Sequence, residues 1–98
     1  SDGNMKKNVE TLENVSDKLR EIRGVKFQYS DESPFDSEMK HYGIIAQEVE
    51  KVFPELVVDS NKGYKTMNYV SLTAVLLQAL KEQQNQIDEL KKQYYRKN

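Results

Sequence analysis

Residues 70–97 read VSLTAVLLQALKEQQNQIDELKKQYYRK, and this stretch decides the fold of the chain. It carries a heptad pattern, in which mostly apolar positions recur at alternating spacings of three and four residues; we call these positions the seam. The seam consists of Thr73, Leu76, Leu80, Gln83, Ile87, Leu90, Tyr94 and Lys97. Neither Pro nor Gly interrupts the pattern, and Ser71 is placed to cap the first turn. A helix of this length runs roughly 40 Å. One copy cannot bury its own seam, so the sequence predicts a coiled coil with other copies of the chain.

The alternative is an amphipathic helix that folds back onto its own domain. Two features favour the coiled coil. The first half of the stretch is apolar around most of its circumference, so it can face both its own domain and a neighbour, through Leu72, Val75, Leu76, Leu77, Ala79 and Leu80. The second half narrows to the seam, as expected where only a coiled coil continues. Gln83 in a core position fixes the register at some cost in stability, whereas the mixture of Leu and Ile leaves open whether two or three helices associate.

The composition excludes several classes of protein. The 98 residues make one small domain, which with 37% hydrophobic and 32% charged residues is polar for a self-sufficient monomer. The 15 basic and 16 acidic residues leave a net charge of −1, which does not support a nucleic-acid interface. Because the chain has no cysteine and a single histidine, we expect no disulfide and no metal centre. We also expect no cofactor. No apolar run approaches 18 residues, so we expect neither a membrane span nor an export signal.

The rest of the chain predicts short elements of both kinds. Leu12, Val15, Leu19 and Ile22 form an apolar stripe that predicts a helix, and Gly24 is a typical helix end. The expected elements, in chain order, are a helix over 11–23, a strand over 25–29, a polar loop over 31–40, a helix over 46–53 that Pro54 ends, and a hairpin of strands 56–58 and 64–69. The predicted fold class is therefore α+β, mostly helical, with small β-hairpin elements and short helices packed on the long C-terminal helix.

By residue type alone, the chain offers little for an enzyme. His41 has no nucleophile beside it in the sequence, and we expect it in a loop or turn with ordinary hydrogen bonds. Glu48 and Glu50 are two residues apart on a short helix, so their carboxylates point in different directions and do not form a paired acid site. Tyr94 lies on the seam and Tyr95 beside it, which favours core and rim positions over a stacking role.

Four blocks of the sequence together resemble one known family. They are the opening SDxxxK, with Ser1, Asp2 and Lys6, then GIIAQEVEKVFPELV at 43–57, GYKTMNY at 63–69 and SLTAVLLQALKE at 71–82. In this order, and followed by a coiled coil, they are similar to the endosialidase-type intramolecular chaperone domain, also called the S74 peptidase family. The block at 43–57 is the specific part. Members of that family sit at the C-terminus of phage tail spikes, tail fibres and neck appendages, and in a membrane-bound transcription factor of animals.

The resemblance implies an autocatalytic serine peptidase that cuts its own chain once. Ser1 would be the nucleophile and Lys6 its general base, and the bond before Ser1 would be cut. The domain of residues 1–98 would then comprise a cleavage-site segment (1–10), an α+β head (11–69) and a coiled-coil helix (70–97).

The resemblance also implies partners and a place of action. Three copies would associate through the seam, at Leu76, Leu80, Gln83, Ile87, Leu90 and Tyr94. The trimer would assist the folding of an upstream β-rich fibre or spike of the same polypeptide. This would happen in the host cell cytoplasm during virion assembly, and we expect the released domain to be missing from the mature virion.

The chemistry of a serine and lysine pair sets two conditions. A hydroxyl is a weak nucleophile, and a lysine serves as its base only when neutral, so an amine whose ordinary pKa is near 10.4 has to be tuned to roughly 7 or 8. Burial is the main means, and Lys7 is a candidate neighbouring cation. We therefore expect the site to assemble only when chains associate and remove water from Lys6. The spacing of five residues also requires a bend between Ser1 and Lys6, which Gly3 and Asn4 permit, or a lysine from a neighbouring chain.

Two other functions stay open on the sequence. Members of the family commonly carry Arg at or near the third residue after the serine, where this chain has Asn4. One alternative is therefore a trimerisation cap of a fibre protein that does not cut. The other is a plain coiled-coil adaptor without a chaperone role. If the cut falls before Ser1, a chain that starts there has the form of the released product.

Overall fold

The structure is a computed structural model that describes residues 1–97. Asn98, the last residue of the predicted domain, and the side chain of Lys97, the last seam position, lie outside this description. The helices and strands are α1 (Val15–Lys18), β1 (Val25–Gln28), β2 (Lys40–Gly43), α2 (Ala46–Glu50), β3 (Val57–Asp59), β4 (Lys65–Met67) and α3 (Tyr69–Lys97). Three 3₁₀ turns accompany them, η1 (Gly3–Met5), η2 (Leu19–Glu21) and η3 (Pro54–Leu56). The α+β class with a dominant C-terminal helix is confirmed.

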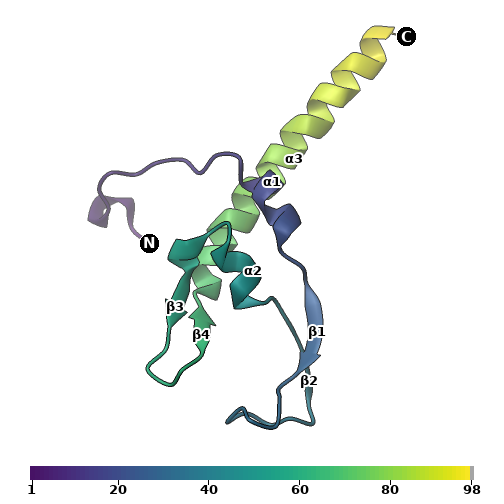
Figure 1. Cartoon of the computed structure of the whole chain (residues 1–98). Coiled ribbons are helices and arrows are strands. Elements are labelled where there is room, and N and C mark those ends of the chain that lie inside the picture. The colour runs from purple at the N-terminus through teal and green to yellow at the C-terminus, as the bar shows by residue number, and fades with distance from the viewer. Residues whose placement is uncertain (98) are drawn as a thin grey trace.

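The long helix α3 has 29 residues and projects well beyond the rest of the chain (Figure 1). Its start differs from the prediction, because Asn68 and not Ser71 acts as the cap. The Oδ1 atom of Asn68 accepts the Ser71 backbone N–H at 3.0 Å, and its carbonyl accepts the Leu72 N–H at 3.2 Å. Asn is as good a cap as Ser, and the first residue of the helix, Tyr69, lies three positions earlier than a Ser71 cap would require.

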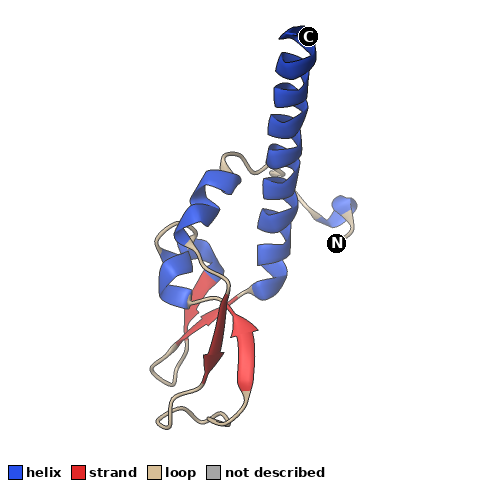
Figure 2. Cartoon of the chain, turned by 90° about the vertical axis from the view of Figure 1, so that its right-hand side faces the viewer, coloured by secondary structure: helices blue, strands red, loops and turns tan. Residues whose placement is uncertain are grey.

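The core lies between the first half of α3 and the elements before it. Its buried members are Val15, Val49, Phe53, Leu56, Leu72, Val75 and Ala79. The last three lie at spacings of three and four residues on α3, which defines the stripe of the helix that faces its own head. From residue 83 to residue 96 every side chain of α3 is exposed, so the head covers only the lower half of the helix (Figure 2).

Two small antiparallel sheets complete the head, one of β1 and β2 and one of β3 and β4. The half-buried alternation predicted for 25–29 is confirmed in β1, and the hairpin of β3 and β4 is confirmed with slightly shorter strands. Strand β2 was not predicted, because its residues Lys, His, Tyr and Gly do not show apolar alternation. In the register, Val25 pairs with Gly43 and Phe27 with His41. Gly43 leaves room for the Phe27 ring, whose Cε1 lies 3.1 Å from the place a Cβ would take.

The helix predicted over 11–23 is wrong in its first part. Residues 11–14 are not helical, and only α1 and η2 follow the predicted stripe. Asn14 lies in the left-handed region with φ 57°, which no continuing α-helix allows. The predicted helix over 46–53 is also shorter. It ends at Glu50, and Pro54 opens η3 rather than simply stopping a helix.

Candidate functional site

The segment that carries Ser1 and Lys6 is bent by a 3₁₀ turn. The Asp2 carboxylate accepts the Asn4 backbone N–H at 2.9 Å and caps this turn. The backbone N–H of Met5 donates to the Asp2 carbonyl, and that of Lys6 to the Gly3 carbonyl, both at 3.1 Å. The chain therefore bends between the two residues, and a bend is one of the two arrangements that the five-residue spacing allows; the other is a lysine from a neighbouring chain. That Ser1 and Lys6 act as a pair stays a prediction.

All residues from Ser1 to Asn14 are exposed. The Lys6 and Lys7 side chains therefore lie in water in the single chain. Figure 1 shows this segment leaving α1 and running away from the head to its own small turn. The arrangement leaves the segment open to a neighbouring chain, and gives it no burial of its own.

The seam of α3 is exposed in the single chain. Leu76, Leu80 and Leu90 expose 51%, 66% and 63% of their surface, and Ile87 exposes 46%. At about 100° per residue, Leu76 lies about 100° around the helix from Val75 but only about 40° from Leu72. The seam is therefore a second stripe that adjoins the packed one, and the head leaves it exposed. The trimer and its contact residues stay a prediction.

The two glutamates of α2 are engaged in ion pairs and not in a joint acid site. Both Nε and Nη2 of Arg23 donate to Glu48 Oε2, at 3.1 and 2.7 Å. These hydrogen bonds lower the pKa of the Glu48 carboxyl and raise the pKa of Arg23. Glu50 instead accepts from Lys65 at 3.1 Å. The expectation that the two carboxylates point apart is confirmed.

Lys65 binds two carboxylates. Its Nζ lies 2.8 Å from Asp59 Oδ1 as well as 3.1 Å from Glu50 Oε2. The hydrogen bonds to Asp59 and Glu50 raise the pKa of Lys65, which keeps the amine charged. Lys65 is therefore unsuited to act as a base.

His41 does not lie in a loop or turn as predicted, but on β2 among aromatic rings. Its ring centroid lies 5.5 Å from that of Phe27 and 5.1 Å from that of Tyr29. These rings belong to a larger group of aromatic side chains that continues to Phe35 and Tyr64. The missed strand explains the error, because β2 brings His41 opposite Phe27.

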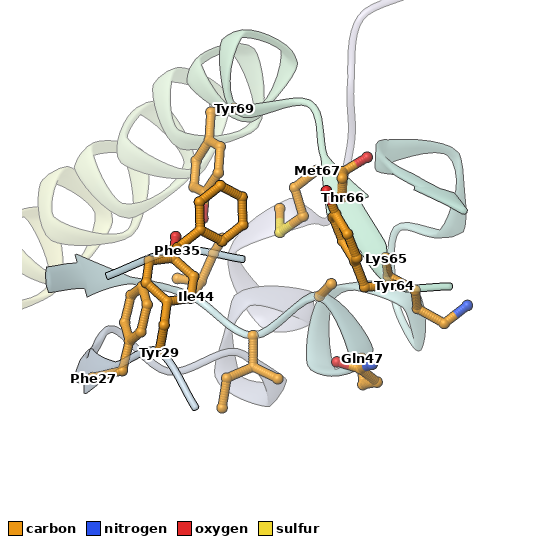
Figure 3. Close-up of a pocket in the computed structure, with 12 residues that line it drawn as sticks. Phe27, Tyr29, Phe35, Ile44, Gln47, Tyr64, Lys65, Thr66, Met67 and Tyr69 are labelled. Carbon is orange, nitrogen blue, oxygen red and sulfur yellow. The ribbon is translucent and has the colours of Figure 1, made fainter. Parts of the chain in front are cut away.

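A pocket of about 410 Å³ lies beside this aromatic group (Figure 3). It is lined by β1, the start of α2, β4 and the start of α3, and its residues include Phe27, Tyr29, Phe35, Tyr64 and Tyr69. The one charged side chain among the lining residues is Lys65, which Asp59 and Glu50 already bind. The pocket offers rings and aliphatic groups, and among the residues that line it there is no nucleophile paired with a base.

Within residues 1–97, no three or more His, Cys, Asp or Glu side chains lie together so that they could hold a metal ion. Over the same residues, no helix is long and apolar enough to cross a membrane.

Comparison with known protein families identifies the family of this chain. A family model described as chaperone of endosialidase, of the S74 peptidase type, matches residues 1–58. The chain belongs to this family. The match covers the segment with Ser1 and Lys6, the β1–β2 sheet and the block at 43–57, so the resemblance seen in the sequence is confirmed. The family is classed as peptidase family S74, and it is described as a chaperone of endosialidase.

The chain is also similar to a phage tail fiber protein. The long tail fiber protein Gp37 of Salmonella phage S16 is 39% identical over 101 residues. The alignment covers 95% of this chain and 13% of that protein. The chain thus spans about an eighth of the length of this relative.

The sequence analysis missed one residue that the structure connects to the N-terminal segment. Glu82 on α3 accepts the backbone N–H groups of both Val15 and Ser16, each at 3.0 Å. The amide of Ser16, and after it that of Val15, lower the pKa of the Glu82 carboxyl against the opposing effect of burial. The only signal in the sequence is a lone acidic residue just before Gln83, which also fits an ordinary exposed helix position.

Proposed function

We propose that this chain is an intramolecular chaperone that forms a trimer through the seam of α3, assists the folding of an upstream fibre of the same polypeptide, and then cuts the bond before Ser1. The observation that carries the proposal is the exposed seam on a helix whose adjoining stripe is already packed. Leu76, Leu80, Ile87 and Leu90 are large apolar side chains left in water at heptad spacing. The family match and the tail fibre relative support the chaperone role and the phage setting.

The cleavage step assigns Ser1 as nucleophile and Lys6 as general base. The Lys6 amine takes the proton of the Ser1 hydroxyl, whose oxygen attacks the carbonyl carbon of the preceding residue. The proton then passes to the departing amine of Ser1 as the peptide bond breaks, and water hydrolyses the resulting ester. Each turnover consumes one peptide bond and one water and restores Ser1 with a free N-terminus.

Association of the chains is the step that activates this site. In the single chain Lys6 is exposed. Water favours the charged amine, and burial at a contact between chains favours the neutral one that can act as a base. Trimer formation therefore precedes cutting, and the folding of the upstream fibre has time to finish while the chains are still joined to their chaperone.

The test is to express the chain behind its upstream fibre segment and to run a denaturing gel. Two bands for the natural sequence and one band for both Ser1→Ala and Lys6→Ala are the expected result. One band for the natural sequence favours the trimerisation cap that does not cut, for which Asn4 is the motivating departure from the family pattern. A native, soluble fibre made without this domain favours the plain coiled-coil adaptor.

A further inference from the structure

The N-terminal segment meets the folded part of the chain at a single well-defined point. Residues 1–14 are all exposed, whereas Val15 exposes 2% of its surface and belongs to the core. At this point each carboxylate oxygen of Glu82 accepts one backbone hydrogen bond. Oε2 accepts from the Val15 N–H and Oε1 accepts from the Ser16 N–H. Glu82 therefore holds the first fixed residues of the chain directly on α3.

The contact replaces a local cap that the sequence does not provide. Asn14 precedes α1 in a left-handed conformation, and its side chain makes no cap hydrogen bond. Two of the free N–H groups in the first turn of α1 are satisfied instead by a carboxylate 66 and 67 residues further along the chain. The left-handed Asn14 then turns segment 1–14 out of the head at that point.

Glu82 occupies the last level at which α3 still touches the head. It is half-buried, and every residue from 83 to 96 is exposed. On the helix it lies one turn beyond Ala79 on the side that faces the head, and directly before Gln83 of the seam. Val15 and Ser16, which we call the root of the N-terminal segment, are thus bound to α3 at the level where the helix extends beyond the head.

We propose that Glu82 is a positioning residue for self-cleavage, which roots segment 1–14 on α3 so that Ser1 and Lys6 reach the contact between chains in a fixed place. This inference rests on the proposed function. A segment of 14 residues can reach at most roughly 50 Å from its root, so a root that moves spreads the reacting groups over a larger volume. A fixed root keeps their effective concentration high once the helices associate.

The experiment compares Glu82→Ala and Glu82→Gln with Glu89→Ala, all in the chain joined to its upstream fibre segment. Glu89 is the matched control, because it lies one heptad further along α3 and is exposed. We measure the rate at which the smaller band appears, the trimer by sedimentation, and the thermal midpoint. The Gln variant keeps one acceptor oxygen, and so tests the role in a protein that folds even if the Ala variant does not.

The expected result is a trimer that cuts more slowly. Glu82→Ala should lower the cleavage rate roughly 2-fold, because release of α1 and η2 lengthens the free segment from 14 to 21 residues and the effective concentration falls as about the −3/2 power of length. Glu82→Gln should fall between Glu82→Ala and the natural sequence, and Glu89→Ala should cut at the natural rate. A Glu82 variant that cuts at the natural rate overturns the inference. So does a loss of rate that only follows a matching loss of trimer, because that is the effect of a purely structural residue.

A second measurement separates this inference from the proposed function. Hydrogen exchange of the peptide that contains Val15 and Ser16 reports on the root itself and needs no cleavage. Protection should be lost in Glu82→Ala and kept in Glu89→Ala. If the natural sequence does not cut at all, the proposed function fails. If protection at Val15 and Ser16 is the same in Glu82→Ala, the positioning role fails.

Discussion

Leu80→Ala is the substitution that tests the seam most directly. Leu80 is the third of the eight seam positions, and it exposes 66% of its surface while the neighbouring Ala79 exposes 5%. Removing the Leu80 side chain therefore costs the single chain little packing. Its effect should appear in the association of the chains, where the proposed trimer buries this residue.

The expected loss of association free energy follows from the exposed fraction of the Leu80 side chain. Burying a whole Leu side chain is worth about 1.5–3 kcal/mol, so the two-thirds of Leu80 that is still in water accounts for about 1–2 kcal/mol per chain. Three chains together lose roughly 3–6 kcal/mol of association free energy, which is about two to four powers of ten in the association constant. Leu80→Asp should cost more, because it places three charges at one level of the core.

Sedimentation equilibrium over a range of concentrations measures this constant. The matched control is Asn85→Ala, at an exposed position on the side of α3 opposite the seam. Leu80→Ala should dissociate at much higher concentration than the natural chain, and Asn85→Ala should not. Equal association constants for Leu80→Ala and Asn85→Ala would refute the location of the interface, and a natural chain that sediments as a monomer at every concentration would refute the trimer.

Three further predictions concern the head. Phe53→Ala removes a side chain that exposes 3% of its surface, and should lower the free energy of unfolding by about 3–5 kcal/mol in a urea titration, whereas Lys51→Ala should change it little. Asn68→Ala removes the cap of α3 and should cost about 1 kcal/mol in the same titration. Arg23 lowers the pKa of Glu48, so the stability from this pair is fully present above the ordinary carboxyl value of 4.5 and is lost as the pH falls through the lowered value. Arg23→Gln should therefore flatten the acid side of the stability curve, and an unchanged curve would contradict the pairing.

Elements that repeat a simple pattern could be predicted from the sequence. Helix α3 differs from its predicted start by one residue, since its heptads and its lack of Pro and Gly leave no other structure. Strand β1 and the hairpin of β3 and β4 follow alternation and a Gly-containing turn in the same way. What these elements share is that each is specified by residues close together in the sequence.

The misses arise where residues far apart in the sequence decide the local structure. Strand β2 exists because β1 pairs with it, and its own residues carry no pattern. The first turn of α1 begins at Val15 because Glu82 supplies a cap there. The predicted start at Thr11 relied on a stripe that includes Leu12, which is exposed. The spacing of Ser1 and Lys6 predicts either a bend between them or a lysine from a neighbouring chain, whereas the point at which their segment is fixed to α3 follows only from the tertiary contact.

The two stripes of α3 also set an order of events under the proposed function. The head packs on Leu72, Val75 and Ala79 and leaves the adjoining seam exposed, so a chain can complete its head before it meets another. Lys6 keeps its water until chains associate, and cutting therefore comes last. In a dilute precursor the rate of cutting per chain should rise with concentration until the trimer is fully formed. Constant cutting per chain at concentrations where sedimentation shows single chains would contradict this order, because the amine would then be neutral without a neighbour to bury it.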